Sequence, residues 1–437
     1  MSWKEVTIGS FLRERPDRIK PNQANFLGLK RIEKIDFSGN IYLADNTSTR
    51  TNMILVKPGD LVISGINVAK GALAVYEGKE DVLATIHYSS YEFDKSVIDI
   101  EYLKWFLISN KFMNILKEQV GGGIKTELKP KKFLSLKIKL PDINLQKEIA
   151  KKINNVYDEI ELLKVTNEEN YELISKLRQS ILQEAVQGKL VPQDPNDEPA
   201  SVLLERIKEE KERLIKEGKI KKEKPLPPIT EDEIPYELPK IWEWTRIGNL
   251  ITLRGGKRIP KGYQLKVDPT EHIYIRITDM KEGTIVDTDL RYIDDYVYEQ
   301  IKNYIITKQD LYITIAGTIG QVGIVPDKFH NMNLTENAAR ITPHLVDKIW
   351  LKYFLSSPII QSMLLDKTNQ MAQPKLALKR IQDTVIPLPP LNEQKRIVEK
   401  VDQLMDLCDE LEKNIEQSKK DSELLMQSVL QEVFKEA

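Results

Sequence analysis

One long internal repeat constrains the fold of this chain more than any other feature of its sequence. Residues 141–186 align with residues 389–434 without a gap, at a constant offset of 248, and fifteen of the 46 aligned pairs are identical. The identities gather at the two ends, as Pro-x-x-Asn-x-Gln-Lys from Pro141 and Leu-x-Gln-Ser-x-Leu-Gln-Glu from Leu177. Unrelated amphipathic helices would share scattered Leu and Glu but not both motifs. We therefore interpret the chain as two copies of one unit.

Both copies have the residue pattern of a long coiled-coil helix. Apolar residues recur in alternating steps of four and three, and no proline interrupts residues 142–186 or 391–437. Forty such residues form a helix about 60 Å long. Polar residues in mid-seam (Asn167, Asn170, Ser418 and Ser422) would fix the register at some cost in stability. We expect Cys408 to be a buried thiol of the seam without a reactive role. The predicted seam contains Ile149, Ile153, Val156, Ile160, Leu163, Ile397, Val401, Leu404, Cys408 and Leu411.

The segments upstream of the two helices also correspond, though more weakly. The strand-like run at residues 59–64 resembles that at 309–314, and the helix-like run at 103–109 matches 351–357 at the same offset of 248. Each block mixes strands and helices, which predicts an α+β protein. The predicted order is a first mixed domain (1–140), a long helix (141–187), a linker with a short charged helix (188–239), a second mixed domain (240–388) and a second long helix (389–437).

Within the linker, the sequence predicts two kinds of segment. Residues 200–217 resemble a solvated helix held by charge pairs four residues apart, and residues 224–228 (Lys-Pro-Leu-Pro-Pro) resemble an extended spacer.

The charge of the chain is unevenly distributed. Its formal net charge is −1, yet residues 1–140 contain 22 Lys and Arg against 16 Asp and Glu, and residues 240–388 contain 20 against 16. The helices and the linker are net acidic. A polyanion such as nucleic acid is therefore a possible partner of the two basic blocks.

The composition favours a cytoplasmic location. The apolar fraction is 41%, there is one cysteine, and no apolar run approaches the ~20 residues that span a bilayer. The N-terminal residues Met-Ser-Trp-Lys-Glu lack the layout of a secretory signal. We expect a soluble protein without disulfides and without a membrane association.

The sequence contains no catalytic or metal-binding motif that we can identify. A phosphate-binding Gly-x-x-x-x-Gly-Lys-Ser/Thr, a His-Glu-x-x-His and an Asn/Asp-Pro-Pro-aromatic loop are all missing from it. Gly317-x-x-Gly320-x-x-Gly323 lies between two strand-like runs and lacks a following lysine, which predicts a tight hairpin. The sequence thus favours a binding or assembly component, with no catalytic residue, metal or cofactor, over an enzyme.

Cationic and amide side chains cluster in corresponding loops of the two blocks. Lysine-rich loops are often only solvated surface, but their recurrence in both blocks favours DNA contacts. Arg and Lys neutralise phosphates, flexible glycine lets backbone N–H groups approach them, and Arg and Gln also read base edges. The candidate DNA-binding residues are Lys125, Lys129, Lys131, Lys132, Arg254, Lys257, Arg258, Lys261, Arg276, Gln321, Gln370, Gln373 and Lys375.

Three stretches, residues 177–193, 238–244 and 389–397, resemble the specificity subunit of type I restriction–modification systems. The layout of two mixed blocks, each followed by a matching helix, extends this resemblance over essentially the whole chain. The sequence departs from the pattern at Asp142-Ile143, where the second copy has Pro390-Leu391.

The resemblance implies a non-catalytic subunit with two target recognition domains, each reading one half of a bipartite, asymmetric site in double-stranded DNA. It implies that the helices pack antiparallel with pseudo-twofold symmetry, set the spacer between the half-sites, and dock two modification subunits that methylate adenine. A restriction motor–nuclease subunit would complete the complex. Two alternatives stay open: a self-contained DNA-modifying enzyme with a divergent site, and a twin-domain protein scaffold.

Overall fold

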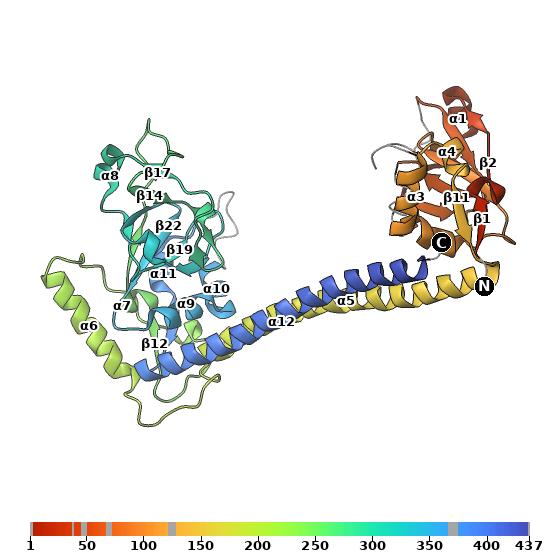
Figure 1. Cartoon of the computed structure of the whole chain (residues 1–437). Coiled ribbons are helices and arrows are strands. Elements are labelled where there is room, and N and C mark those ends of the chain that lie inside the picture. Colours follow the sequence, from red (N-terminus) through yellow and green to blue (C-terminus); the bar gives the residue numbers. More distant parts are fainter. Residues whose placement is uncertain are drawn as a thin grey trace. The chain divides into compact units, whose positions relative to one another are not determined.

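The computed structural model describes residues 3–36, 39–44, 50–66, 72–120, 128–365 and 375–435. The chain forms two compact units, one of residues 1–170 with 414–437 and the other of residues 171–413. Each unit contains a mixed α/β domain together with one part of each long helix, α5 (Ile143–Val186) and α12 (Leu391–Val433) (Figure 1).

The domain of the first unit is built on two sheets. One is antiparallel with strand order β2-β10-β7-β8, and the other is mixed with order β3-β6-β9-β4-β5 and a parallel β4–β9 pair. A separate pair, β1–β11, leads into α5. The strands are β1 (Lys4–Thr7), β2 (Leu12–Glu14), β3 (Arg18–Ile19), β4 (Arg31–Ile35), β5 (Ile41–Ala44), β6 (Met53–Val56), β7 (Leu61–Ser64), β8 (Leu73–Val75), β9 (Val82–Thr85), β10 (Tyr88–Phe93) and β11 (Lys137–Leu140).

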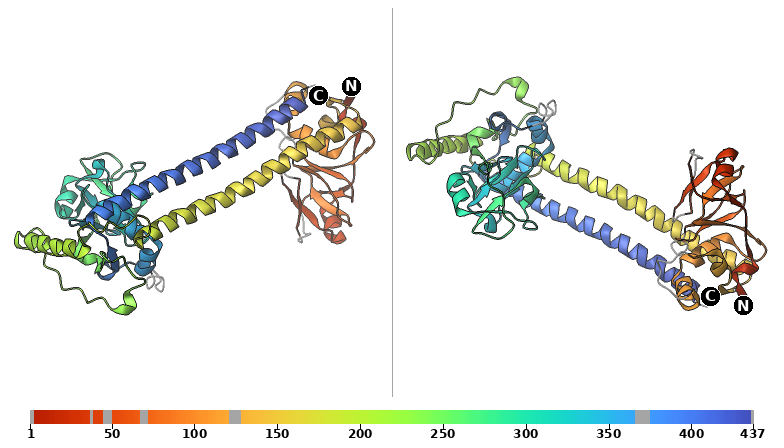
Figure 2. Two further views of the ribbon diagram at one scale, coloured as in Figure 1. Left: turned by 90° about the horizontal axis from the view of Figure 1, so that it is seen from below. Right: turned by 90° about the horizontal axis from the view of Figure 1, so that it is seen from above.

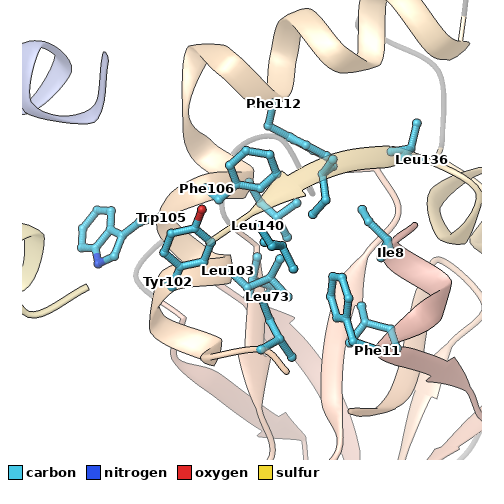
Figure 3. Close-up of a cluster of buried hydrophobic side chains, with 14 of the residues drawn as sticks. Ile8, Phe11, Leu73, Tyr102, Leu103, Trp105, Phe106, Phe112, Leu136 and Leu140 are labelled. Carbon is cyan, nitrogen blue, oxygen red and sulfur yellow. The ribbon is translucent and has the colours of Figure 1, made fainter. Parts of the chain in front are cut away.

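The main core of this domain lies between its antiparallel sheet and its helices. Tyr102, Phe106 and Phe112 gather there with residues such as Leu73 (Figure 3). Phe434, just after α12, joins the same core, with its ring centroid 5.5 Å from that of Tyr102. The end of α12 is thereby fixed to the first domain. The helices are α1 (Pro21–Leu27), α2 (Ile100–Ile108), α3 (Asn110–Val120) and α4 (Pro130–Leu134).

The domain of the second unit repeats this topology. Its sheets have the orders β13-β22-β19-β20 and β17-β14-β21-β18, and β14–β21 is the parallel pair that corresponds to β4–β9. The predicted match of residues 59–64 with 309–314 is confirmed, because β7 and β19 occupy the same place in the two antiparallel sheets.

The second unit has these elements: α6 (Ala200–Lys216), β12 (Glu243–Arg246), α7 (Ile247–Leu250), β13 (Ile251–Gly255), β14 (His272–Ile275), β15 (Met280–Lys281), β16 (Thr284–Ile285), β17 (Tyr292–Ile293), α8 (Asp295–Ile301), β18 (Ile305–Ile306), β19 (Leu311–Thr314), β20 (Val322–Ile324), β21 (Met332–Leu334), β22 (Ala338–Pro343), α9 (Lys348–Ser356), α10 (Pro358–Leu365), α11 (Leu378–Asp383) and β23 (Val385–Leu388).

The repeated Pro-x-x-Asn-x-Gln motif joins each long helix to its domain. The buried Gln146 amide donates to the carbonyl of Pro141 at 2.9 Å and accepts from the N–H of Asp99, the residue that caps α2, at 2.9 Å. In the second unit, Gln394 donates to the Pro389 carbonyl at 3.0 Å and accepts from the N–H of Asp347, the cap of α9, at 2.8 Å. The motif therefore recurs because it makes the same buried contacts twice.

The two long helices pack against each other in both units, as the resemblance implied (Figure 2). In the first unit Asn167 donates to Ser418 Oγ at 3.5 Å, and in the second Arg178 bonds to Asp409. From the first contact to the second, the residue number increases along α5 and decreases along α12. The two helices therefore run antiparallel. Buried residues recur every seven positions in each helix: Ile153, Ile160, Asn167, Ile174 and Ile181 in α5, and Val401, Cys408, Ile415 and Ser422 in α12.

The seam is narrower than the four-three spacing predicted. Ile149 and Ile397 are buried, and Val156 and Leu404 are half-buried. Leu163 and Leu411, however, are 45% and 47% exposed. When only two helices pack together, each buries a single stripe of residues against the other. Leu163 and Leu411 lie beside this stripe, on the flank of the helix pair.

The linker is docked on the second domain. Ala200, Leu203 and Ile207 of α6 are buried, so the prediction of a solvated helix applies only to its outer face, where Arg213 pairs with Glu210 and Glu217. The buried Arg246 donates to the carbonyls of residues 227 and 228 and forms an ion pair with Glu233, and so holds the proline-rich segment against the domain.

His344, beneath α6, provides a pH-dependent test of this packing. Its Nε2 lies 2.8 Å from Thr252 Oγ1. Burial, followed by the charge of Lys211, lowers the pKa of His344 from 6.5 to about 4, against a smaller opposing effect of Glu210. The unfolded state therefore binds a proton near pH 6.5 that the folded state resists until near pH 4, so stability is lost as the pH falls through this window.

We expect this loss to contribute about 3 kcal/mol between pH 7 and pH 4. His344→Gln keeps a polar side chain beside Thr252 but cannot titrate, so the variant should lose less stability than the wild type over this window. Urea unfolding of both proteins at several pH values between 7 and 4 gives the free energy of unfolding of each. Taking the difference between the two proteins removes the effects of carboxylates that both contain. Parallel stability curves would contradict the buried neutral imidazole.

Candidate nucleic-acid interface

In the first domain, three segments meet beside the predicted lysine cluster. The N–H of Leu128 donates to the carbonyl of Gly65, just after β7, at 2.9 Å. The N–H of Gly65 donates to the carbonyl of His87, between β9 and β10, at 2.8 Å. The chain then continues through Lys129 into α4, which contains Lys131 and Lys132, and all three lysines are exposed. Lys125 lies outside the described residues.

The second domain brings the corresponding three segments together. The N–H of Leu376 donates to the carbonyl of Ile315, just after β19, at 2.8 Å, and the N–H of Ile315 donates to Asn337, between β21 and β22, at 2.8 Å. Lys375 is exposed and pairs with Ala316 in an isolated bridge. Gln370 and Gln373 lie outside the described residues. Each domain thus presents at least one cation beside the end of the corresponding central strand, β7 or β19.

The loop that follows β13 is basic, but its glycines act differently from the prediction. A Cβ on Gly256 would lie 2.1 Å from the carbonyl oxygen of Thr335, so only glycine fits there. The N–H groups of Gly256 and Lys257 donate to the carbonyls of Ala338 and Leu334, both at 2.9 Å. The sequence suggested that backbone N–H groups of this loop would bind phosphate. These two N–H groups are instead occupied by carbonyls of the domain, so phosphate contacts here must come from the side chains.

The cations of this loop differ in their partners. Arg258 pairs with Glu336 at 2.6 Å, although its side chain is 77% exposed. The Lys257 ammonium lies 5.6 Å from the ring centroid of Tyr304. Lys261 is exposed, and Arg254 forms no ion pair within the described part of the chain. Among the described residues, Arg254, Lys257 and Lys261 of this loop thus form no ion pair, whereas Arg258 does.

Two further predicted contacts lie in different surroundings. Arg276 donates to Asp279 at 2.8 Å and also pairs with Asp289, and its hydrogen bond with Asp279 raises its pKa. Its guanidinium is thus already neutralised within the domain. Gln321 is exposed at the end of the connection between β19 and β20, which form the antiparallel hairpin predicted for the glycine-rich run.

Among the described residues, no group of three or more His, Cys, Asp or Glu side chains is arranged to hold a metal ion. Within the same residues, no helix combines the length and the apolar character needed to cross a membrane.

Comparison with known proteins identifies the family. Two segments, residues 18–170 and 239–418, match the model described as "Type I restriction modification DNA specificity domain", and together they make up more than half of the chain. The chain belongs to the type I restriction modification DNA specificity family. The two matched segments of this specificity protein contain most of its two mixed domains and parts of α5 and α12.

Relatives in this family include specificity subunits from Escherichia coli. The EcoAI subunit is 35% identical over 260 residues, which are 56% of this chain and 42% of that protein. The EcoEI subunit is 34% identical over 256 residues, again 56% of this chain and 42% of that protein. The matches thus span less than half of the length of these two relatives. The EcoDI subunit is 20% identical over 440 residues, which cover 100% of this chain and 88% of that protein.

Two solved structures share the fold of this specificity protein. The HsdS subunit from Thermoanaerobacter tengcongensis has a TM-score of 0.60 and 16% identity, over 99% of this chain and 96% of that one. A chain from a structure of the complex assembly and conformational transition of the type I R-M system has a TM-score of 0.67 and 15% identity, over 99% of this chain and 97% of that one. The predicted family and the predicted fold class are confirmed.

The sequence did not reveal every cation near this interface. Arg340 of β22, Lys302 after α8 and Lys221 of the linker line a cavity next to Arg254. Arg340 is separated from Arg254 by more than eighty residues in sequence, and the strand register that pairs them is a tertiary feature. No motif within either segment signals this arrangement.

Proposed function

We propose that this chain is the non-catalytic DNA-specificity subunit of a type I restriction–modification complex, and that each mixed domain binds one half of a bipartite, asymmetric site in double-stranded DNA. One observation carries the proposal: the two domains repeat one topology and converge the same three segments, yet they present different side chains there. The first domain presents lysines 129, 131 and 132, and the second presents Lys375 and the loop from Arg254 to Lys261. Two equivalent sites with different side chains suit two different half-sites.

The helix pair would set the spacer between the half-sites and dock two modification subunits. The support is apolar surface on its flanks: Leu163 and Leu425 are about half exposed in the first unit, and Leu177 and Leu411 in the second. The register of the two helices places Leu163 within about one helical turn of Leu425, and Leu177 within about one turn of Leu411. At the repeat offset of 248, Leu163 corresponds to Leu411 and Leu177 corresponds to Leu425. The repeat therefore supplies two similar apolar patches, which suit two copies of one partner.

Within this proposal, the modification subunits carry the adenine methylation and a restriction motor–nuclease subunit joins to cleave unmodified DNA. The chain itself supplies recognition and spacing, and it acts without a cofactor or a membrane in the cytoplasm.

The deciding experiment is a single-molecule methylome of cells that carry this gene with its neighbouring modification gene, with and without this chain. We expect the chain to be required for adenine methylation at one asymmetric, two-part motif. An unchanged methylome with an expressed partner would overturn the proposal.

Purified protein separates the alternatives. A DNA-modifying enzyme would methylate or cleave duplex DNA by itself, and a protein scaffold would show no salt-dependent affinity for duplex DNA. For a specificity subunit we expect salt-dependent binding with neither reaction.

A further inference from the structure

The second unit contains a strongly cationic cavity of about 710 Å³ beside the loop that follows β13. It is lined by the end of β13 and its two glycines, by the turn between α8 and β18, by Arg340 of β22 and by two residues of the docked linker. Its charged lining side chains are Arg254, Arg340, Lys302, Lys221 and Glu223. Four cations thus face one acidic residue among the described lining residues.

At one wall of the cavity two arginines stand directly opposite each other. Arg254 of β13 and Arg340 of β22 are partners in the antiparallel register, so their side chains project from the same face of the sheet. Like charges in such a pair repel each other and destabilise the sheet. One Arg340 nitrogen donates to the Ile305 carbonyl at 2.6 Å, and no ion pair of either arginine is found within the described residues. Burial lowers the pKa of Arg340. The charge of Asp310 opposes this shift, and the charge of Arg254 adds to it.

The first domain shows how the same position is neutralised. There Arg15, just after β2, lies beside Ser90 of β10, to whose carbonyl its N–H donates at 2.9 Å. Its guanidinium pairs with the buried Asp60 at 2.6 Å and with Glu92 at 2.7 Å. The second domain has a second arginine where the first has a serine. Its aspartate corresponding to Asp60, Asp310, accepts hydrogen bonds from Thr307 and Thr342.

We propose that the cavity binds a phosphate group, with Arg254 and Arg340 as the two facing donors. Guanidinium groups present several N–H donors in a plane and bind phosphate oxygens in pairs, and a bound anion would remove the repulsion between the two strands. Lys221 and Lys302 also line the cavity, although Lys302 already pairs with Glu299 at 2.7 Å, and the partly exposed Tyr304 belongs to the same lining.

The phosphate group has two possible sources, a phosphodiester of the DNA backbone or a free phosphate compound such as a mononucleotide. The DNA source rests on the proposed function, whereas the phosphate site itself does not. Because Gly255 and Gly256 belong both to the cavity wall and to the basic loop, a DNA phosphate bound here would anchor that loop on the duplex.

The test uses the full chain and Arg254→Gln, since Arg254 has no ion-pair partner within the described residues that the change would expose. Thermal unfolding is followed while inorganic phosphate replaces chloride at constant pH and ionic strength. We expect phosphate to raise the Tm of the wild type by about 2 to 4 °C and to leave that of Arg254→Gln unchanged. In chloride at low salt, Arg254→Gln should unfold at the same Tm as the wild type or above it, because it removes a like-charge neighbour.

Lys281→Gln is the matched control. Lys281 is exposed on β15, lies outside the cavity lining and carries the same charge, so its variant should respond to phosphate as the wild type does. An equal phosphate response in wild type and Arg254→Gln would overturn the site. Destabilisation of Arg254→Gln in chloride with an intact phosphate response would also overturn it, since Arg254 would then be a structural residue.

Duplex DNA then identifies the source. If the phosphate belongs to DNA, Arg254→Gln lowers the slope of log affinity against log salt by about 1 relative to the wild type. A lost phosphate response with an unchanged slope assigns the site to a free phosphate compound. If the wild type shows no salt-dependent DNA binding, the proposed function fails, while the phosphate response still decides the site.

Discussion

Inserting seven residues into each long helix is expected to abolish methylation of the native site while leaving the two half-site sequences unchanged. The insertions go after Asn170 in α5 and after Lys413 in α12, which the register of the antiparallel pair places nearly opposite each other. Seven residues preserve the spacing of the buried stripe and lengthen each helix by about 10.5 Å. That length equals about three base pairs, over which the duplex also turns by roughly 100°.

The expected result follows from the proposal that the helices set the spacer. Each domain keeps its own loops and should read the same bases, but the two half-sites at their native separation no longer fit both domains. The methylome should lose the native motif at least 100-fold, and any motif that replaces it should contain the same two half-sites with a different spacer.

A length-neutral control separates spacing from helix disruption. Glu168→Gln with Glu169→Gln changes exposed residues of α5 near the insertion without altering its length, and it should retain the native motif. Continued methylation at the native spacing by the insertion variant, or a change in the bases of either half-site, would contradict the spacer role.

The organisation of this chain is predictable from sequence where a local pattern determines it. The two long helices follow from unbroken heptads, and the repeated Gln146 and Gln394 motifs signal that each helix begins in the same environment. The strands that begin at Leu61 and Leu311 are recognisable because each follows an aspartate that accepts a hydrogen bond from the preceding turn.

The rest depends on contacts between distant segments. The sequence places Leu163 in the seam, but the width of the buried stripe is set by the partner helix. The sequence of α6 predicts a solvated helix, but one face of it, which includes Leu203, is buried against the second domain. The pairing of Arg254 with Arg340 requires the strand register, which no local pattern encodes. The candidate interface was therefore predictable as regions of charge and not as geometry.

Asp60→Ala is expected to destabilise the first domain strongly, by about 3 kcal/mol. Asp60 is 2% exposed, and its carboxylate accepts from Arg15 Nε at 2.6 Å, from the Lys57 N–H at 3.0 Å and from Ser90 Oγ at 2.8 Å. Its removal leaves three donors without this acceptor. Glu92 retains part of the charge of Arg15, which keeps the loss below that of a fully unpaired ion.

Asp310→Ala is the matched comparison in the second domain. Asp310 is equally buried and precedes the equivalent strand. Its carboxylate accepts hydrogen bonds from the N–H and the hydroxyl of Thr307 and from the hydroxyl of Thr342. No arginine hydrogen-bonds to it among the described residues, so we expect a smaller loss, about 1 to 2 kcal/mol.

Hydrogen exchange measured by mass spectrometry resolves the two domains within the full chain. Amides of β7 report on Asp60→Ala and those of β19 on Asp310→Ala, and a loss of 3 kcal/mol corresponds to roughly 100-fold faster exchange in β7. Asp60→Asn, which keeps an acceptor but not the charge, should fall between the wild type and Asp60→Ala. Equal losses for the two alanine variants would show that the Arg15 ion pair adds nothing to the first domain, and that the difference between the domains at this position is not electrostatic.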